Sequence, residues 1–457
     1  MIKTLPNMTF AFLFFLCLLI FKPAPGVILG QWTVNVIALA VLALLGVYLC
    51  FIYFKHRGPI TSYGITFSDW SDHPIPIYLL VSSFSLILST LYGMRVSPTL
   101  TSLQDLIELH RYFFYFFFFI LALNIRITDL KKLLLPVGMI ILIVELFGVI
   151  QFFNLFNVNN HIGLFYTISE RHYHMIIRQQ RIPSFFLNPN MYGSFLVIVV
   201  GLLLAYITFT KSFKKRILLP LLMLTFMSVF FTTSRTAVIT VAGLIVYWTL
   251  FSLMFNRGHW KRTIQLGLAT FFLYGALAVV LIPQITYLDY AADQIFENIG
   301  NPYGKGDDEI GPPKIKFKES IGTIRTSVDS VNSFNNRYEY WRMNLEKFKE
   351  QPLFGHGPMK SGEFVAFADN SYLFILARYG IVGLLIFLAF YLYIYMRTTV
   401  VIKRKEGSDS KQILALAINL ILVGYVVMGM VAEVWFNLQS MTILFMMMGL
   451  LYNEHLK

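Results

Sequence analysis

Runs of about twenty apolar residues follow one another along most of the chain, and short polar segments separate them. A run of this length crosses a lipid bilayer as an α-helix, because a helix satisfies its backbone hydrogen bonds internally. The pattern therefore predicts an all-α polytopic membrane protein with about twelve transmembrane helices. Their expected positions are 8–21, 33–54, 75–93, 106–124, 133–155, 191–209, 217–233, 237–255, 263–282, 371–396, 411–433 and 439–453.

The composition agrees with a membrane protein. Of all residues, 57% are hydrophobic and 13% are charged, whereas a soluble domain is about half apolar and a quarter charged. Cys17 and Cys50 lie within apolar runs, which favours packing roles over a disulfide or a metal site. The first run follows Lys3 as a signal peptide would, but prolines crowd the next residues, KPAPG at 22–26, so we expect a retained helix.

Lysine and arginine concentrate in alternate loops of a chain whose net charge is +13. Basic residues follow the second, fourth, sixth, eighth and tenth predicted helices. Under the positive-inside rule, these loops and both termini are cytoplasmic. Topology thus explains the charge, and no nucleic-acid partner is expected. The loop cations are Lys55, Arg57, Arg126, Lys131, Lys132, Lys211, Lys214, Lys215, Arg216, Arg257, Lys261, Arg262, Arg397, Lys403, Arg404 and Lys405.

Two of the loops predicted to face outward are unusually long, at 157–190 and 283–370. Most connections in compact folds are short, and long ones are usually functional or disordered. We interpret 1–457 as a single polytopic membrane domain, in which 283–370 forms the large extracytoplasmic loop. The acidic triplet at 307–309 favours a solvated charge run over a cation site, because no ordered ligand set surrounds it.

The end of the large loop predicts a short amphipathic helix near 336–350. An asparagine, Asn335 or Asn336, can cap its start, and Pro352 ends it. The glycines of the following PLFGHGP stretch, 352–358, favour a tight turn over a phosphate-binding loop. The expected apolar stripe of the helix consists of Tyr338, Trp341, Leu345 and Phe348.

Ionisable residues within or beside the predicted spans collect near the outer side. Such residues are expensive in a membrane and are functional candidates by default. Their clustering predicts a polar cavity that opens near the outer leaflet, and arginines there suit a phosphate group of a lipid-linked substrate. The spacing of Glu108 and Arg111 favours a simple ion pair. The remaining members are His110, Arg235, Arg378, Glu433 and, at greater depth, Glu145.

Three stretches resemble the bacterial O-antigen ligase and polysaccharide polymerase superfamily. The first is RIPSFFLNPNMYG at 181–193, and the second is TSRTA at 233–237. The third is RYEYWRMNLEKFKEQPLFGHG at 337–357, followed by ADNSYLFILARYGIVG at 368–383. The resemblance depends on the order of these stretches along the chain and on their common position at the predicted outer side of the membrane. The predicted topology extends it over the whole chain.

The resemblance implies a GT-C-like, inverting glycosyltransferase that uses no metal or cofactor and acts at the outer face of the bacterial plasma membrane. Its donor would be an undecaprenyl-diphosphate-linked glycan, drawn from the membrane lipid phase. Ligases of this superfamily move the glycan to a lipid core, and polymerases move it to another lipid-linked repeat unit. By resemblance, the arginines that hold the diphosphate are Arg181, Arg235, Arg337 and Arg378.

The resemblance also points to Asp369 and Asn370 as catalytic residues. Many members carry a His before Asn at this position, so the role of the His does not transfer unchanged to Asp369. An aspartate before a helix N-terminus is favoured in its ionised form and can accept the proton of an attacking hydroxyl. The alternative is that Asp369 is only the helix N-cap. Asn370 and Ser371 would position the base or cap the helix.

A polymerase is our first interpretation, and an O-antigen-type ligase is the first alternative. A transporter or lipid-linked oligosaccharide flippase is a rival of another class, but transporters place charges near the midplane and show paired halves. A non-catalytic envelope scaffold is a third reading. A flippase and a chain-length regulator are implied as partner proteins only by the resemblance to polysaccharide polymerase pathways.

Overall fold

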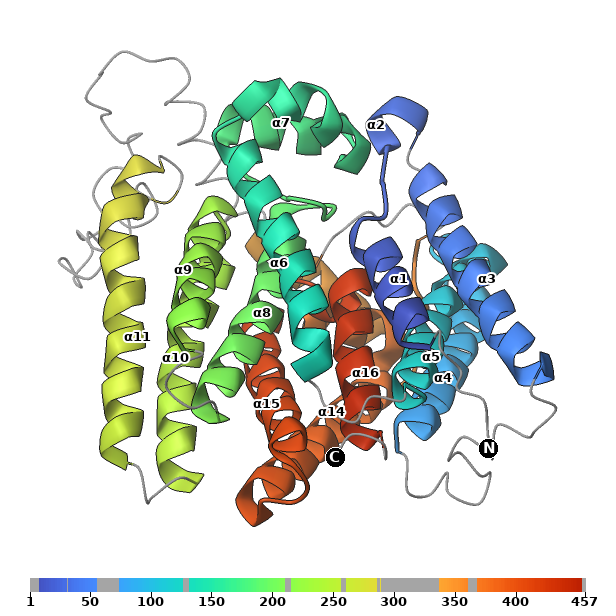
Figure 1. Cartoon of the computed structure of the whole chain (residues 1–457). Coiled ribbons are helices and arrows are strands. Elements are labelled where there is room, and N and C mark those ends of the chain that lie inside the picture. Colours follow the sequence, from blue (N-terminus) through green and yellow to red (C-terminus); the bar gives the residue numbers. More distant parts are fainter. Residues whose placement is uncertain are drawn as a thin grey trace, which may run out of the picture.

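A computed structural model describes residues 8–30, 32–55, 74–125, 131–209, 215–255, 260–285, 288, 337–360 and 368–453 of the chain. Within these ranges the regular structure is helical, and no β-strand occurs (Figure 1). The all-α prediction is therefore confirmed. The acidic triplet at 307–309 and the expected cap residues Asn335 and Asn336 lie outside the described residues.

The long apolar helices follow the predicted order. In the described part of the chain, nine helical stretches are long and apolar enough to cross a membrane, and three apolar helices, α1, α9 and α16, are shorter. The protein is a multi-pass membrane protein, while a count above nine spans remains a prediction. The helices are α1 (Met8–Ile20), α3 (Trp32–Lys55), α4 (Pro74–Val96), α5 (Leu109–Leu123), α6 (Lys131–Phe152), α8 (Pro189–Phe209), α9 (Lys215–Phe231), α10 (Arg235–Phe255), α11 (Trp260–Leu281), α14 (Ser371–Arg404), α15 (Asp409–Gly429) and α16 (Leu438–Tyr452).

Helices α8 and α15 form the buried centre of the bundle, whereas α3 and α11 lie at its edges (Figure 1). Glycines let the two central helices approach closely. A Cβ atom on Gly201 would lie 3.0 Å from the side chain of Ile421, and one on Gly424 would lie 2.7 Å from that of Val197. Small residues at such contacts bring membrane helices together, because packing drives their association.

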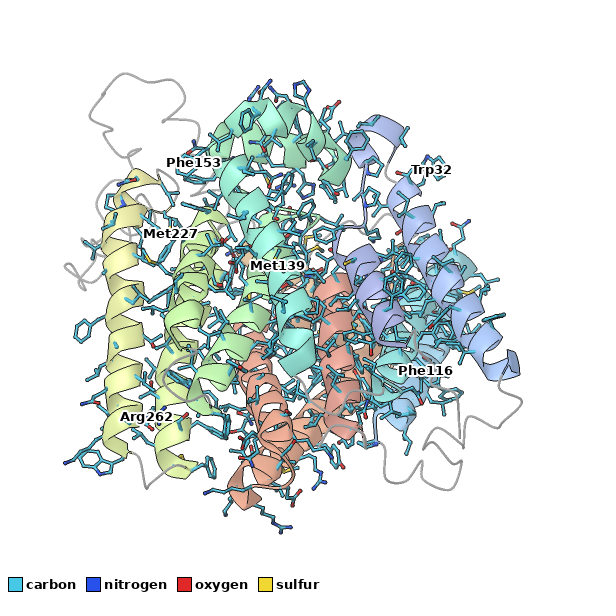
Figure 2. All side chains as sticks on the ribbon, in the orientation of Figure 1. Trp32, Phe116, Met139, Phe153, Met227 and Arg262 are labelled. Carbon is cyan, nitrogen blue, oxygen red and sulfur yellow. The ribbon has the colours of Figure 1, made fainter. Side chains whose placement is uncertain are left out.

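The outer surface of the bundle is rich in apolar side chains (Figure 2). Trp32 on α3 is 66% exposed and Met139 on α6 is 50% exposed. An apolar surface of this extent would be unfavourable in water and is the expected surface toward lipid tails.

The predicted outer loop at 157–190 contains regular structure of its own. It holds η5 (Ile162–Tyr166) and α7 (Glu170–Gln179), and α7 lies across the same end of the bundle as α2 (Gly26–Leu29) (Figure 1). Backbone hydrogen bonds join the two regions, from Ala24 N to Phe165 O at 2.7 Å and from Val27 N to Thr167 O at 3.1 Å. This part of the chain therefore forms a cover over one end of the bundle.

Residues 337–350, near the end of the large predicted loop, are helical. Trp341 and Phe348 are partly buried, but Tyr338 is 72% exposed and Leu345 is 38% exposed. Asn344 is fully buried instead. The four residues keep the helical spacing of the predicted stripe, of which only Trp341 and Phe348 are partly buried.

Candidate functional site

An ion pair joins two of the residues predicted for the site. The Arg337 Nε donates to Asp369 Oδ2 at 3.2 Å, and the side chains are 25% and 37% exposed. Arg337 belongs to the helical segment 337–350, and Asp369 lies just before α14. Asp369 has a left-handed backbone with φ 43°. The structure thus places a cation and a carboxylate together, partly exposed, just before the N-terminal end of α14.

Asn370, rather than Asp369, caps α14. Its side-chain oxygen accepts hydrogen bonds from Tyr372 N at 2.9 Å and Leu373 N at 3.0 Å. The Asn370 amide donates to Met430 O at 2.8 Å. The alternative that Asp369 is the N-cap is therefore wrong, because the cap geometry is already filled one residue later. Asn370 fixes the start of α14 to the end of α15.

Glu433 is a further carboxylate beside Asp369. It follows α15 and immediately precedes η9 (Val434–Phe436), and its Oε1 accepts a hydrogen bond from Ala368 N at 2.7 Å. The sequence placed Glu433 among the outer ionisable residues but did not assign it to the site. Only the backbone contact to Ala368 shows that it holds the stretch that carries Asp369.

Burial raises the pKa of Glu433, and the Arg378 guanidinium opposes this shift. A carboxyl whose pKa is higher in the folded state stabilises the fold below its unfolded pKa, and this contribution is lost as pH rises through the folded pKa. We expect the Tm of the wild type to fall relative to that of Glu433→Gln as pH rises above 4.5, the ordinary value. Thermal unfolding in detergent at a series of pH values measures this, and parallel curves would contradict it.

Arg378 lies inside the bundle, as predicted. It is 6% exposed, its Nε donates to Pro358 O at 2.8 Å, and its guanidinium carbon lies 3.6 Å from the centroid of the Phe374 ring. Among the described residues, its buried Nη1 has no hydrogen-bond partner. In this structure Arg378 therefore joins α14 to the backbone of Pro358, at the end of the 352–358 stretch.

Helix α14 is broken at Gly380, where φ is 63° and ψ is −167°. The segment 352–357 fills the break: His356 N donates to Ala377 O at 3.2 Å and Ile381 N donates to Pro352 O at 2.9 Å. Gly357 N likewise donates to Arg378 O at 2.9 Å. These bonds satisfy backbone groups that an interrupted membrane helix leaves open. The PLFGHGP stretch is thus a structural turn.

His356 within this segment is buried and fully hydrogen-bonded. Its Nδ1 lies 2.7 Å from Ser97 Oγ, and its Nε2 lies 2.9 Å from Lys347 O. Burial lowers the pKa of the His356 imidazole. A histidine whose two nitrogens are both occupied in this way has a structural role, since it joins the helical segment 337–350 to the end of α4.

A second charged cluster lies at the start of the fourth predicted span, where η3 (Leu103–Glu108) leads into α5. The predicted ion pair is present, with Arg111 Nε 2.9 Å from Glu108 Oε2. Glu108 also pairs with the ammonium of Lys360, whose backbone N donates to Asp105 Oδ1 at 3.2 Å. Burial lowers the pKa of Lys360. No local pattern indicates a role for Lys360, because its partners lie about 250 residues away in the sequence.

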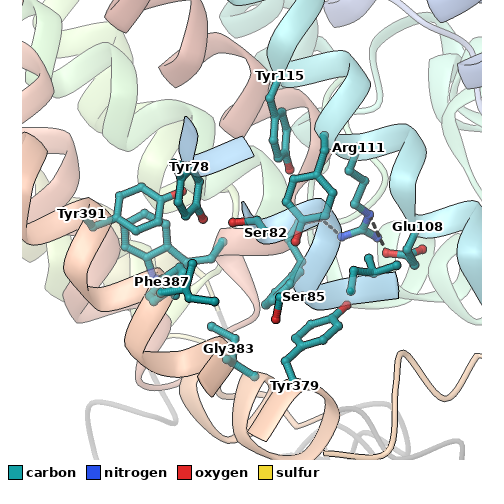
Figure 3. A pocket seen from close by; sticks show the side chains of 16 residues that line it. Tyr78, Ser82, Ser85, Glu108, Arg111, Tyr115, Tyr379, Gly383, Phe387 and Tyr391 are labelled. Atoms are coloured by element: carbon teal, nitrogen blue, oxygen red, sulfur yellow. Dashed lines mark hydrogen bonds and ion pairs between the residues drawn. The ribbon is translucent and has the colours of Figure 1, made fainter. Parts of the chain in front are cut away.

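A cavity of about 60 Å³ lies beside this cluster (Figure 3). Arg111 and Glu108 lie on one side of it, and Tyr78 and Tyr391 lie on the other. A space of this size holds a few water molecules rather than a sugar. Arg111 also donates to Phe436 O at 2.8 Å, so the cluster is joined to the connection that carries Glu433.

The other two predicted arginines lie in stretches that the fold brings together. Ile182 N, next to Arg181, donates to Phe231 O at 3.4 Å. Ser234 Oγ, next to Arg235, donates to Asn190 Oδ1 at 2.9 Å. The RIPSFFLNPN and TSRTA stretches therefore meet at the shared ends of α8, α9 and α10.

Asn437 connects these arginine-bearing stretches to the rest of the site. It follows η9, and its amide donates to Ser194 Oγ on α8 at 2.8 Å and to Met191 O at 3.3 Å. The start of α8 is thereby fixed to the connection between α15 and α16, which also carries Glu433. All the predicted site residues therefore lie at the same end of the bundle.

Residues 220–388, which we call the O-antigen ligase segment, match the O-antigen ligase family. This confirms the superfamily resemblance that the motifs predicted. No curated protein matches the chain.

The O-antigen ligase segment runs from within α9 to within α14. It contains Arg235, Arg337, Asp369, Asn370 and Arg378, and it leaves out the NPN stretch and the last two helices. The family supports glycan transfer at the membrane and a lipid-linked glycan as the class of substrate. The roles of the individual residues remain proposals.

Proposed function

We propose that this protein transfers a glycan from an undecaprenyl-diphosphate carrier to an acceptor hydroxyl at the outer face of the bacterial plasma membrane. The first candidate activity is polymerisation of lipid-linked repeat units. The observation that carries the proposal is the accessible Arg337–Asp369 pair, which lies within the O-antigen ligase segment at the mouth of α14. The alternating basic loops support the outward orientation.

The Arg337–Asp369 ion pair suggests how binding of the donor would free the catalytic carboxylate. Without a donor, the Arg337 guanidinium binds the Asp369 carboxylate at 3.2 Å. A diphosphate is a stronger partner for a guanidinium, because two phosphate oxygens can accept its parallel N–H groups. Donor binding would therefore draw Arg337 away and release the carboxylate next to the reacting carbon. The base would become available only when the donor is present.

The transfer is then a single inverting displacement. The acceptor oxygen forms a bond to the anomeric carbon, the bond from that carbon to the diphosphate oxygen breaks, and the acceptor proton moves to Asp369. The diphosphate leaves with the bonding electron pair, and Arg337, Arg235 and Arg181 stabilise its growing negative charge. Arg378 and Asn370 would position this machinery, since Arg378 joins α14 to Pro358 O and Asn370 joins the start of α14 to Met430 O at the end of α15.

A ligase is the second candidate, favoured by the family that residues 220–388 match. The two activities share donor and chemistry and differ only in the acceptor. The acceptor is another lipid-linked repeat unit in a polymerase and a separate lipid in a ligase. A flippase and a chain-length regulator would be the expected partners of the polymerase.

The deciding experiment uses the purified full chain in liposomes with lipid-linked repeat units extracted from the source organism, without added metal. Polymerisation gives a ladder of products on a gel, and ligation gives a single shifted band only when a separate acceptor lipid is supplied. No product, with the lipid-linked unit crossing the bilayer, would overturn the enzyme and favour a flippase.

Arg337→Ala is expected to abolish the products, because it removes both the donor contact and the partner of Asp369. Arg342→Ala is the matched control, since Arg342 lies on the same helical segment and pairs with exposed Glu346 at 3.7 Å. The assay measures initial product formation at saturating donor. Equal loss in both variants would mean that the helix, and not the Arg337 guanidinium, is required.

Arg235→Lys is expected to raise the donor KM by about tenfold, with kcat less affected. Lysine keeps the charge but cannot form a two-pronged contact with phosphate oxygens, which is worth about 1–3 kcal/mol. Initial rates over a donor series measure the change, and Arg262→Lys at the opposite end of the bundle is the control. A donor KM equal to that of the wild type would rule out a forked contact.

A further inference from the structure

A large apolar groove opens in the half of the bundle opposite to Asp369. Its volume is about 770 Å³, and aliphatic side chains of six helices, α1, α6, α8, α9, α15 and α16, form almost all of its lining. Helix α6, which carries Met139, crosses the front of the bundle at this place (Figure 2). A cavity of this size accommodates a large organic ligand.

The lining residues locate the groove near the ends of the helices. They include Leu133 to Leu142 near the start of α6 and Leu218 to Leu224 near the start of α9. They also include Met446 and Leu450 near the end of α16. Asp369 precedes the start of α14, at the other end of the bundle. In the predicted topology the groove therefore lies in the cytoplasmic leaflet, and the proposed catalytic site faces the outer one.

Basic residues begin two of the helices that line the groove. Helix α6 starts with Lys131 and Lys132 and α9 starts with Lys215 and Arg216, and the lining residues of the two helices begin shortly afterwards, at Leu133 and Leu218. Lys411 stands in the first turn of α15, beside a single acidic residue, Asp409. An apolar groove with a basic mouth complements a ligand that has hydrocarbon chains and an anionic head.

The groove is open down to the backbone of α6. A Cβ atom added to Gly138, which lines the groove, would have no atom of the described protein within 4 Å. Met139 beside it is 50% exposed. Water has no polar partners along such a wall, so hydrocarbon must fill it in a membrane.

We propose that this groove binds one anionic glycerophospholipid of the cytoplasmic leaflet. Its acyl chains occupy the space between α1, α6 and α9, and its phosphate lies at the basic starts of α6 and α9. Basic pockets between membrane helices on the cytoplasmic side recognise anionic headgroups in this way. The bound lipid completes the packing of α6, whose partner helices leave this side uncovered.

The test measures the lipids that the full chain retains in mild detergent by native mass spectrometry, with equal amounts of phosphatidylglycerol and phosphatidylcholine supplied. We expect phosphatidylglycerol to be retained at least tenfold more. Gly138→Leu places a branched side chain in the groove from a Cβ position with open space around it, and is expected to lose this bound lipid. Gly243→Leu is the matched control, because Gly243 on α10 also has open space and does not line the groove.

A second pair of variants separates the headgroup from the acyl chains. Lys131→Gln/Lys132→Gln should reduce the preference for phosphatidylglycerol by about fivefold for each charge removed, whereas Lys131→Arg/Lys132→Arg should keep it. Equal retention of both lipids, or equal retention by the two glycine variants, would overturn the proposal. Displacement by undecaprenyl phosphate with no effect of the glutamine changes would assign the groove to the tail of the carrier and would also overturn it.

Discussion

Asp369→Asn is expected to lower the turnover of glycan transfer by on the order of 10²–10⁴-fold, the usual contribution of a general base. Asparagine has almost the same shape but cannot take up the acceptor proton at neutral pH. The fold should persist, because Asn370 rather than Asp369 caps α14. Single-turnover rates in the liposome assay measure the loss directly.

Donor binding provides the control for this variant. Asp369→Asn removes the carboxylate that holds Arg337, so the guanidinium should meet the diphosphate more readily, and donor affinity should be kept or improved. Asp409→Asn, in the first turn of α15, changes an aspartate outside the site and should leave turnover unchanged. Turnover of Asp369→Asn within threefold of the wild type would rule out the base and leave the ion pair as a structural contact.

Gly380→Ala is expected to destabilise the protein by about 2–4 kcal/mol. The backbone of Gly380 has φ 63°, which L-residues rarely adopt, and an added Cβ would lie 2.3 Å from Leu353 O. The alanine would therefore displace the segment 352–357 from the break in α14 and expose open backbone groups at membrane depth. Thermal unfolding of the detergent-solubilised protein measures the effect.

Gly243→Ala is the control for the substitution itself. Gly243 lies within α10 with open space around its Cβ position, so alanine there should be neutral or stabilising by about 1 kcal/mol at most. The break at Gly380 lets the segment 352–357 bind the backbone oxygens of Ala377 and Arg378. Loss of stability should therefore be accompanied by loss of transfer activity. If Gly380→Ala unfolds like the wild type, the break does not depend on glycine.

Much of the fold follows from local patterns. Each long apolar run became an apolar helix, and the cap residues Asn370 and Ser408 begin their helices through local side-chain hydrogen bonds. The length of an apolar run decides helix formation in a membrane before any tertiary partner is present. The orientation of the segment 337–350 could not be predicted in this way, because it depends on contacts outside the segment, of Arg337 with Asp369 and of the Lys347 backbone oxygen with His356.

The candidate site was predicted only in part. The family resemblance of the motifs pointed to Arg337 and Asp369, and the structure joins them across 32 residues of sequence. Lys360 was missed as a member of the charged network, and the contact of Glu433 with Ala368 N was not predicted, because nothing near them in the sequence indicates these partners. Asp369 as a helix cap was wrong, since two neighbouring residues can each cap a helix and only the backbone geometry selects one.

The sequence alone determined that this is a multi-pass helical membrane protein, where its helices lie, and that it resembles the O-antigen ligase superfamily. These properties depend on hydrophobicity and short motifs, which act locally. Only the tertiary structure decided that Gly380 interrupts α14, that the turn at 352–357 fills the interruption, and that Glu433 holds the backbone beside Asp369. Those contacts satisfy buried polar groups, and a buried polar group can take its partner from any part of the chain that packing brings near.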